Sequence, residues 1–348
     1  MLKLKRQTIF VNNLNNNTMK KIILLFGSVL FTTSLLFSQG KPHVKVFSNF
    51  NYDLSAEEGE EAFKEFELKR SYLGYSYKID ESFSAKVTFD VGSNDAGSAY
   101  TAFLKIASLT WKANEKTTIN FGQIGTKNFK FMEKNWGKRY IYKSMLDQKK
   151  WASSADLGVT ADYMFSKNIS IDVQVLNGEG YKKTQSSNGL MRGGLGVIYT
   201  GNDFKLRLAR DIVPRENYGE NNDVQTISTI AGMYKMSNLN IGGEYNIKEN
   251  ANSIIDNEQS AMSIYGSYKL NEKTSVFGRY DKLDSEDALE AQWNIDNDGE
   301  LTIFGIERKM TKGVTVAVNI QSWKDATLDN EPEASAESTL YINLEYKF

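Results

Sequence analysis

Short segments that alternate apolar and polar residues run through most of this sequence, and they restrict the chain to folds built from two-faced strands. From Phe83 to Val91 the odd-numbered residues are apolar and the even-numbered ones are polar. The same alternation occurs over 169–175, 314–320 and 340–348. A period of two residues is typical of β-strands that have one apolar and one polar face. The chain is therefore predicted to be all-β.

The segments between these strands alternate regularly in length. Seven short polar turns are predicted, among them KIDES, KANEK and KLNEK, and eight longer hydrophilic links, among them SAEEGEE and KDATLDNEPEASAE. Together with two free ends they give about 16 strands of ~9–11 residues, the length that crosses a bilayer when the strand is tilted. We therefore predict a single antiparallel transmembrane β-barrel with short periplasmic turns and long extracellular loops.

The N-terminus has the composition of an export signal. A Met-Lys-Lys that begins at Met19 precedes an apolar run of 17 residues, IILLFGSVLFTTSLLFS, which is the pattern of a secretory signal peptide. We predict a signal peptide over residues 19–38 and the barrel domain over residues 39–348. A transmembrane anchor is the alternative, and the run is slightly short for one. Residues 1–18 are interpreted as an extension from a misassigned start site.

A soluble all-β protein would also contain alternating strands. The export signal and the even number of strands favour a membrane barrel, because in lipid only a closed barrel satisfies every strand backbone group. Aromatic residues near the predicted strand ends favour it too, since membrane barrels carry aromatic girdles at both interfaces. These residues are Tyr75, Tyr77, Trp111, Tyr163, Tyr199, Tyr234, Tyr268, Tyr280 and Trp323.

The stretch from Lys127 to Lys150 concentrates positive charge in a chain that is nearly neutral. It holds seven Lys and one Arg against Glu133 and Asp147, whereas the whole chain has 42 basic and 43 acidic residues. Removal of residues 1–38 takes away five basic residues and no acidic one, which leaves 37 basic against 43 acidic residues. The stretch follows the fifth predicted strand, where a link is long enough to fold inward and narrow a pore.

This basic stretch could form a short helix with charge on one face. Four lysines share a face at helical spacing and three apolar residues lie roughly opposite: Lys127, Lys130, Lys134 and Lys138 against Met132, Trp136 and Tyr140.

If the apolar face lay against the barrel wall, the ammonium groups would face the lumen, where rings of Lys or Arg favour anions. An exposed loop that contacts lipopolysaccharide or solvent is the alternative. The predicted anion-facing constriction consists of Lys127, Lys130, Lys134, Lys138, Arg139, Lys143, Lys149 and Lys150.

Charged residues on the polar phases of the strands are candidates for the lumen wall. The basic candidates are Lys45, Lys86, Arg207 and Arg279. Three acidic residues are expected on the same polar faces, so the predicted wall carries both charges: Asp90, Asp211 and Asp281. Arg70 and Lys105 fit no clean phase and are not assigned to either face.

Three segments carry a resemblance to known outer-membrane proteins. An alternating strand that ends in Phe348, LYINLEYKF, resembles the signal read by bacterial outer-membrane assembly machinery. The segments FELKRSYLGYSYKI and FMEKNWGKRYIYKSMLDQKKWASSADLGV resemble the phosphate-selective porin (O and P type) family of bacterial outer-membrane porins. With the strand rhythm, the resemblance covers residues 39 to 348.

The resemblance implies a 16-stranded barrel, a homotrimer, long loops that face outward and one loop folded into the lumen. Characterised members of the family use an arginine ladder and a lysine cluster in the pore. Only the basic stretch can be matched to these features in this sequence.

Enzymatic and metal-dependent functions have little support in the sequence. The chain has no Cys, and a Ser-His-Asp site would depend on its one His, His43. NIDNDGE begins like a calcium loop, but position 12 of that loop is Gly305 and not the required Glu. No catalytic residue, metal ion or cofactor is predicted.

The sequence therefore predicts an outer-membrane diffusion channel for small hydrophilic solutes that prefers anions, with phosphate as one candidate. Expected partners are small anionic or polar solutes, outer-membrane lipids and lipopolysaccharide, the barrel assembly machinery and further copies of the chain, and no nucleic acid. A closed structural or adhesive barrel is the alternative, and an outer-membrane phospholipase or protease is a weaker one.

Overall fold

The computed structural model describes residues 40–92, 100–185, 189–214, 223–287, 289, 291–328 and 332–348. The predicted leader segments, 1–18 and 19–38, lie outside the described residues. Within the described ranges, no helix has both the length and the apolar character needed to cross a membrane.

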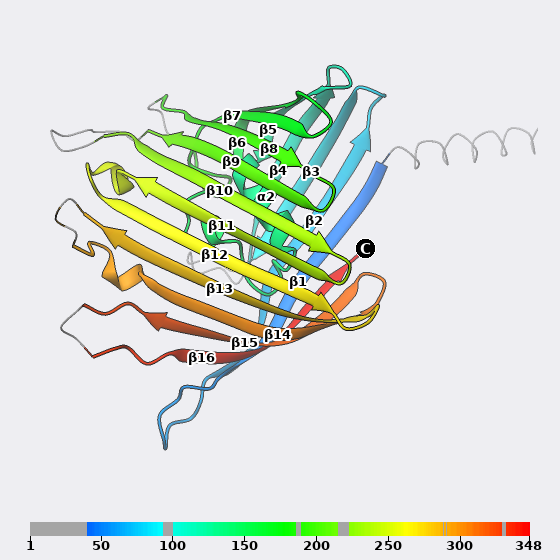
Figure 1. Ribbon diagram of the computed structural model, residues 1–348. Helices are drawn as coiled ribbons and strands as arrows, with labels where there is room; N and C mark the ends of the chain where they lie inside the picture. The colour runs from blue at the N-terminus through cyan, green and yellow to red at the C-terminus, as the bar shows by residue number, and fades with distance from the viewer. Residues whose placement is uncertain are drawn as a thin grey trace, which may run out of the picture. The chain divides into compact units, whose positions relative to one another are not determined.

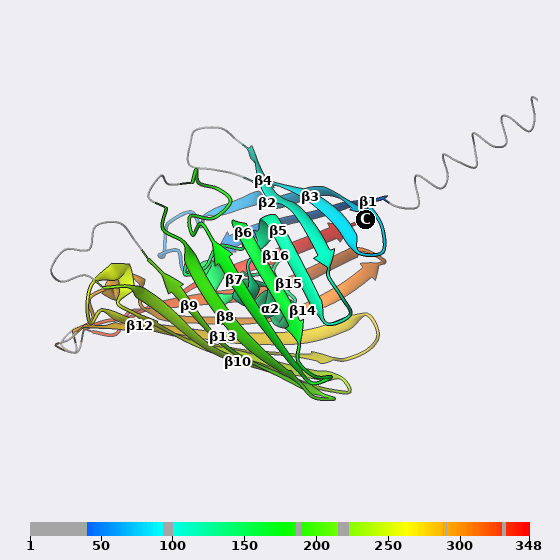
Figure 2. The same ribbon diagram turned by 90° about the horizontal axis from the view of Figure 1, so that it is seen from above.

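Sixteen antiparallel strands form one closed barrel (Figures 1 and 2). Each strand lies beside its neighbours in the sequence, and β1 pairs with β16 to close the sheet. This arrangement confirms the predicted 16-stranded barrel. The strands are β1 Gly40–Asp53, β2 Lys64–Lys78, β3 Phe83–Gly92, β4 Thr101–Lys112, β5 Thr117–Gly125, β6 Ala155–Met164, β7 Ile169–Leu176, β8 Arg192–Thr200, β9 Phe204–Val213, β10 Gln225–Met236, β11 Leu239–Glu249, β12 Glu258–Lys269, β13 Thr274–Glu286, β14 Gly299–Thr311, β15 Val314–Asp325 and β16 Glu337–Lys347.

The connections alternate between short turns and long links, as the sequence predicts. All seven turns at one end of the barrel have two to four residues, and the eight long links lie at the other end (Figure 1). The longest link, residues 126–154 between β5 and β6, contains helices α2 Lys127–Trp136 and α3 Met145–Gln148. Two other long links contain short 3-10 helices, η1 Ala251–Ser253 and η2 Ile295–Asn297.

The strands carry apolar residues on the outer face of the barrel and polar residues on the inner face. In β7, Val173 and Val175 are exposed on the outer face, while Asp172 and Gln174 are buried inside. Successive side chains of a strand point to opposite faces, so one sequence pattern produces both surfaces. The alternation has the sense expected of a barrel that meets lipid on its outer face.

Aromatic side chains surround the short-turn end of the barrel on its outer face. Trp323 was predicted to belong to an aromatic girdle, but its ring points into the barrel. The ammonium of Lys149, on the inward-folded link, lies 4.2 Å from the centre of this ring. The exposed aromatic residues at the short-turn end include Tyr75, Trp111, Tyr163, Tyr199, Phe204, Tyr234 and Tyr268.

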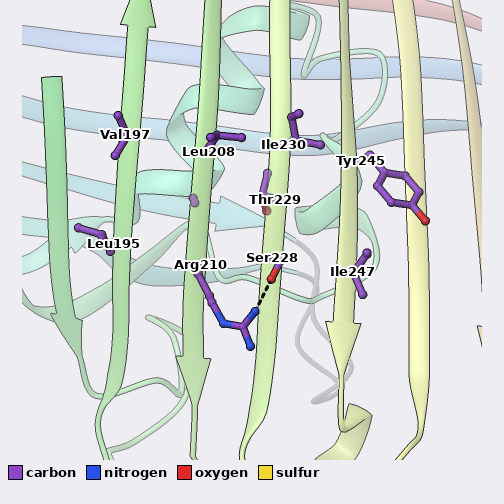
Figure 3. Close-up of a pocket in the computed structure, with 10 residues that line it drawn as sticks. Leu195, Val197, Leu208, Arg210, Ser228, Thr229, Ile230, Tyr245 and Ile247 are labelled. Carbon is purple, nitrogen blue, oxygen red and sulfur yellow. Dashed lines mark hydrogen bonds between the residues drawn. The ribbon is translucent and has the colours of Figure 1, made fainter. Parts of the chain in front are cut away.

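The outer face of β8 to β11 carries an apolar groove of about 430 Å³ (Figure 3). Leu195, Leu208 and Ile230 are among its lining residues. Arg210 lies at one end, where it donates hydrogen bonds to Ser228 (2.9 Å) and to Glu249 (2.8 Å). The ion pair with Glu249 compensates the charge of this outward-facing arginine.

Candidate functional site

The link between β5 and β6 folds into the barrel and is held there by aromatic packing. Trp136, the last residue of α2, is buried against the inner face of the sheet. Its ring centre lies 5.3 Å from that of Tyr265 on β12 and 6.3 Å from that of Phe277 on β13. Gly137 then ends the helix with a φ of 69°, a left-handed conformation that costs glycine little. We call residues 126–154 the inward loop.

Two apolar clusters inside the barrel hold the inward loop against the wall. In the first, Trp136, Tyr140 and Ile141 of the loop pack on inner-face residues of β1 and β12 to β15. In the second, Met145 and Leu146 pack on β10, β12 and β13. The inner face of these strands is apolar where the loop covers it, so the usual polar lumen lining is interrupted there. The wall residues of the two clusters are Phe47, Tyr265, Phe277, Leu301, Ile303 and Ala317 in the first, and Ile227, Ala261 and Leu283 in the second.

Two of the predicted lumen-wall arginines face inward but lie beneath the inward loop. Arg207 is 2% exposed and forms a two-pronged ion pair with Asp172, at 2.5 and 2.9 Å. Arg279 is paired in the same way with Asp281 and donates a 2.7 Å hydrogen bond to the carbonyl oxygen of Lys143. Arg279 therefore holds the loop through its backbone, and Arg207 holds it through a side chain.

The lysines of the inward loop have different surroundings. Lys130 and Lys134 are exposed on α2, and Lys150 is exposed after α3. Lys127 pairs with Asp162 at 2.5 Å. The helix ends at Trp136, so Lys138 is not on its face; it is buried and pairs with Glu307 at 3.0 Å. Only part of the predicted basic face is thus uncompensated.

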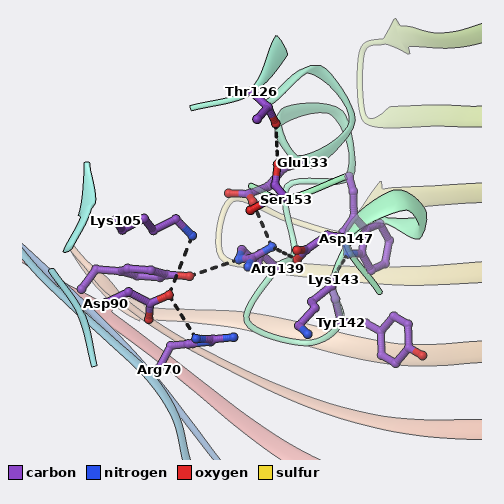
Figure 4. A network of polar contacts seen from close by, with 12 residues as sticks. Arg70, Asp90, Lys105, Thr126, Glu133, Arg139, Tyr142, Lys143, Asp147 and Ser153 are labelled. Atoms are coloured by element: carbon purple, nitrogen blue, oxygen red, sulfur yellow. Dashed lines mark hydrogen bonds and ion pairs between the residues drawn. The ribbon is translucent and has the colours of Figure 1, made fainter. Parts of the chain in front are cut away.

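Arg139 also connects the inward loop to strand β2 (Figure 4). Its guanidinium pairs with two loop carboxylates, Asp147 at 2.6 Å and Glu133 at 3.1 Å. Its Nε also donates a 3.3 Å hydrogen bond to the hydroxyl of Tyr72 on β2. Tyr72 packs on Phe47 of β1, with ring centres 5.8 Å apart. The contacts of the loop with the wall therefore extend through β1 to β2.

A group of polar residues on β2, β3 and β4 lies next to the contact between Arg139 and Tyr72 (Figure 4). Asp90 is fully buried; it accepts hydrogen bonds from Arg70 (3.0 Å) and from the hydroxyl of Tyr181. The ammonium of Lys105 lies 3.9 Å from the same carboxylate. Tyr181 belongs to the link between β7 and β8, so a second link reaches into the barrel.

A basic cavity of about 870 Å³ lies between the inward loop and the long links. Its lining contains nine basic side chains against two acidic ones, Asp147 and Glu179. No carboxylate of the described residues lies within 4 Å of the ammonium groups of Lys143, Lys149, Lys150, Lys182 or Lys183. The nine basic residues are Arg70, Arg139, Lys143, Lys149, Lys150, Lys182, Lys183, Arg192 and Lys248.

Burial lowers the pKa values of several lysines in the loops below their usual value of 10.5. It is the main cause for Lys143 and Lys149, and for Lys182 in the β7–β8 link. Lys130 is exposed only in part within the barrel, and its pKa is lowered first by the solvent it has lost and then by the neighbouring ammonium group of Lys127. A low-dielectric surrounding disfavours the charged form of an amine, so these lysines hold their protons less firmly than solvated ones.

The remaining lumen-wall candidates lie toward the short-turn end. Lys86 is exposed on β3, and its charge also acts on Lys130 of α2. Lys45 on β1 has its ammonium 5.8 Å from the ring centre of Phe47. Positive charge therefore occurs on both sides of the inward loop.

Several basic residues in the cavity or beside it were not predicted from the sequence. Lys105 is the extra residue of a β-bulge, since the register of β3 against β4 shifts by one between Thr88 and Phe89. A bulge breaks the period of two, which explains why Lys105 fits no clean phase. Glu67 and Arg70 both contact lumen residues although they are three apart, so the phase also changes within β2. For Lys182 and Lys183 the sequence holds no signal, because their position depends on long-range folding of a link.

Comparison with known proteins supports the fold. No protein-family model and no curated protein matches this sequence. Among solved structures, OmpT, an outer-membrane protein of Vibrio cholerae described in a trimer form, has a TM-score of 0.62 and 15% identity, with 89% of this chain and 99% of that chain covered. An anion-selective porin from Comamonas acidovorans has a TM-score of 0.66 and 10% identity over 89% and 99% of the two chains.

A third structure, OprB of Pseudomonas putida, has a TM-score of 0.69 and 9% identity, and 91% of this chain and 96% of that chain are covered. At these identities the likeness concerns the barrel fold. The resemblance to the phosphate-selective family stays a prediction, since no family model matches the chain.

Proposed function

We propose that this protein is an outer-membrane diffusion channel for small hydrophilic solutes and that it prefers anions. The observation that carries the proposal is the basic cavity, where nine basic side chains face two acidic ones beside the inward loop. Within a low-dielectric cleft, charges of one sign concentrate the field and raise the local concentration of counter-ions. Positive charge selects anions as a class and does not single out one of them. Phosphate is therefore one candidate among several.

The fold supports this proposal. The barrel is closed and its inner face is largely polar, which suits a water-filled channel. Structures of similar fold include one described as an anion-selective porin and one described in a trimer form. We extend the proposal to a homotrimer whose long links face the cell exterior.

The competing proposal is a closed structural or adhesive barrel. The two apolar clusters and the contact between Arg139 and Tyr72 favour it, because they fill part of the lumen. A small molecule would then find no continuous path.

Planar-bilayer recordings test the two proposals against each other. Purified protein should insert as discrete conductance steps, and across a gradient of potassium chloride the reversal potential should have the sign of chloride preference. A reversal potential of the opposite sign would contradict the anion preference. Heat-modifiable, correctly folded protein that never conducts would support the closed barrel.

A further inference from the structure

Asn128, in the first turn of α2, lies between two buried ion pairs of the barrel wall. It is 1% exposed. Its Oδ1 accepts a 2.8 Å hydrogen bond from Nε of Arg207, and its Nδ2 donates a 3.1 Å hydrogen bond to Asp211. A primary amide has an acceptor and a donor on one carbon, so Asn128 can satisfy a cation and an anion together.

Each of these wall residues is already paired with an opposite charge. Arg207 is bound to Asp172, and Asp211 is bound to Arg192 at 2.6 Å and to Gln174 at 2.9 Å. The same Gln174 accepts a 3.0 Å hydrogen bond from the backbone nitrogen of Lys127. The network is therefore built on the wall, and α2 docks on it through one side chain and one backbone group.

Two glycines of β8 give this network its space. A Cβ atom at Gly194 would lie 2.1 Å from the Asp211 carboxylate, and one at Gly196 would lie 2.3 Å from the Arg207 guanidinium. Both side chains can therefore lie across β8 toward the loop. The wall is shaped to present them to the start of α2.

We propose that Asn128 is the positioning residue that fixes the first turn of α2 against the β7 to β9 wall and thereby sets the width of the pore beside it. The opposite end of the helix is held by the packing of Trp136. A helix that is held at both ends keeps the loop in one position. If the Asn128 amide is lost, Arg207 and Asp211 each lose their hydrogen-bond partner on the loop, and the first turn of α2 is no longer fixed. As a determinant of pore width, this role rests on the proposed channel function.

Three variants test the role of the amide. Asn128→Leu removes both hydrogen bonds, and Asn128→Asp keeps the acceptor toward Arg207 but places a carboxylate against Asp211. Asn128→Gln keeps one acceptor and one donor on a neutral side chain, so it can remake both hydrogen bonds. Asn135→Leu, on the same helix, is the matched control, since the amide nitrogen of Asn135 has no hydrogen-bond partner among the described residues.

Two readouts separate this role from the channel function. One is the single-channel conductance. The other is the mobility of a spin label at Lys134→Cys, an exposed site on α2 in a chain that has no native Cys. The label reports the position of α2 even if the parent protein does not conduct.

We expect Asn128→Leu and Asn128→Asp to lose the parent's single conductance level and to raise the label mobility, while heat modifiability shows an intact barrel. Asn128→Gln should return both readouts toward the parent values, and Asn135→Leu should match the parent. Parent-like mobility in Asn128→Leu and Asn128→Asp would overturn the proposal.

Discussion

Trp136 and Tyr265 meet inside the barrel with their ring centres 5.3 Å apart and their planes at 61°. One ring ends α2 and the other stands on β12, so a single aromatic contact joins the inward loop to the wall. Beneath the Tyr265 ring lies Gly242 of β11, where a Cβ atom would be 2.4 Å from the ring. The contact therefore depends on a glycine in the neighbouring strand as well as on the two rings.

Replacing Trp136 by Ala should loosen the inward loop without opening the barrel. Truncation of a buried Trp costs about 3–5 kcal/mol, and here the loss should fall on loop docking because the β-ladders do not involve this side chain. We expect noisier open-channel currents and faster proteolysis within residues 126–154. Trp111→Ala, in the outer aromatic girdle, is the control and should leave the current noise unchanged. Quiet, parent-like currents from Trp136→Ala would count against the packing role.

The fold could be predicted from the sequence because its signals are local. Alternation with a period of two identifies each strand, and the turn residues separate one strand from the next. Closure of the sheet then follows from the physics of the bilayer, where an open edge would leave backbone groups unsatisfied.

The candidate site could be predicted only in part. The basic stretch is visible as a charge cluster, and Lys143, Lys149 and Lys150 do line the cavity. Whether a lysine is paired depends on residues far away in the chain: Lys138 meets Glu307 and Lys127 meets Asp162. No spacing rule connects such pairs.

The anion preference should weaken as the pH rises. A lysine is cationic below its pKa, and burial lowers the pKa values of Lys143 and Lys182 below 10.5. These ammonium groups therefore lose their charge at a lower pH than solvated lysines, whose pKa is about 10.4. The reversal potential should therefore begin to move toward zero at a pH below the one at which solvated lysines lose their charge. Lys143→Arg/Lys182→Arg should resist this change, and an equal shift in that variant would show that other groups titrate.

The two ends of the barrel should differ in accessibility on intact cells. An epitope tag inserted after Leu289, in the link between β13 and β14, should bind antibody, because we propose that the long links face outward. A tag in the 270–273 turn should bind only after the outer membrane is permeabilised. The reverse result would invert the proposed orientation while leaving the barrel itself intact.

Deletion of Phe348 should impair assembly. Its side chain is 82% exposed, and its backbone exchanges hydrogen bonds with Val44 of β1 at the closure of the barrel. We predict that the truncated chain accumulates in the periplasm or is degraded, as measured by membrane fractionation and heat modifiability. Phe348→Tyr keeps an aromatic end and should assemble. A heat-modifiable barrel in the outer membrane without Phe348 would remove this residue from the assembly signal.

The sharpest test of anion preference reverses charges that have no partner. Lys138 and Arg139 are poor choices, because they belong to buried ion pairs and removing one member of such a pair costs about 3–5 kcal/mol. Lys143, Lys150 and Lys182 line the basic cavity without an ion pair to the described residues. Changing these three to Glu leaves six basic against five acidic side chains in the lining.

With the lining nearly balanced, the reversal potential of this triple variant should move close to zero while folding stays intact. The matched control reverses Lys167, Lys273 and Lys312, which are exposed on the short turns. It changes the net charge of the chain by the same amount, but charges beyond about 8 Å are largely screened at physiological salt, so its reversal potential should stay near the parent's. Equal shifts in both variants would mean that net charge, and not the basic cavity, governs the ion preference. No shift in either would place the conducting path away from the cavity.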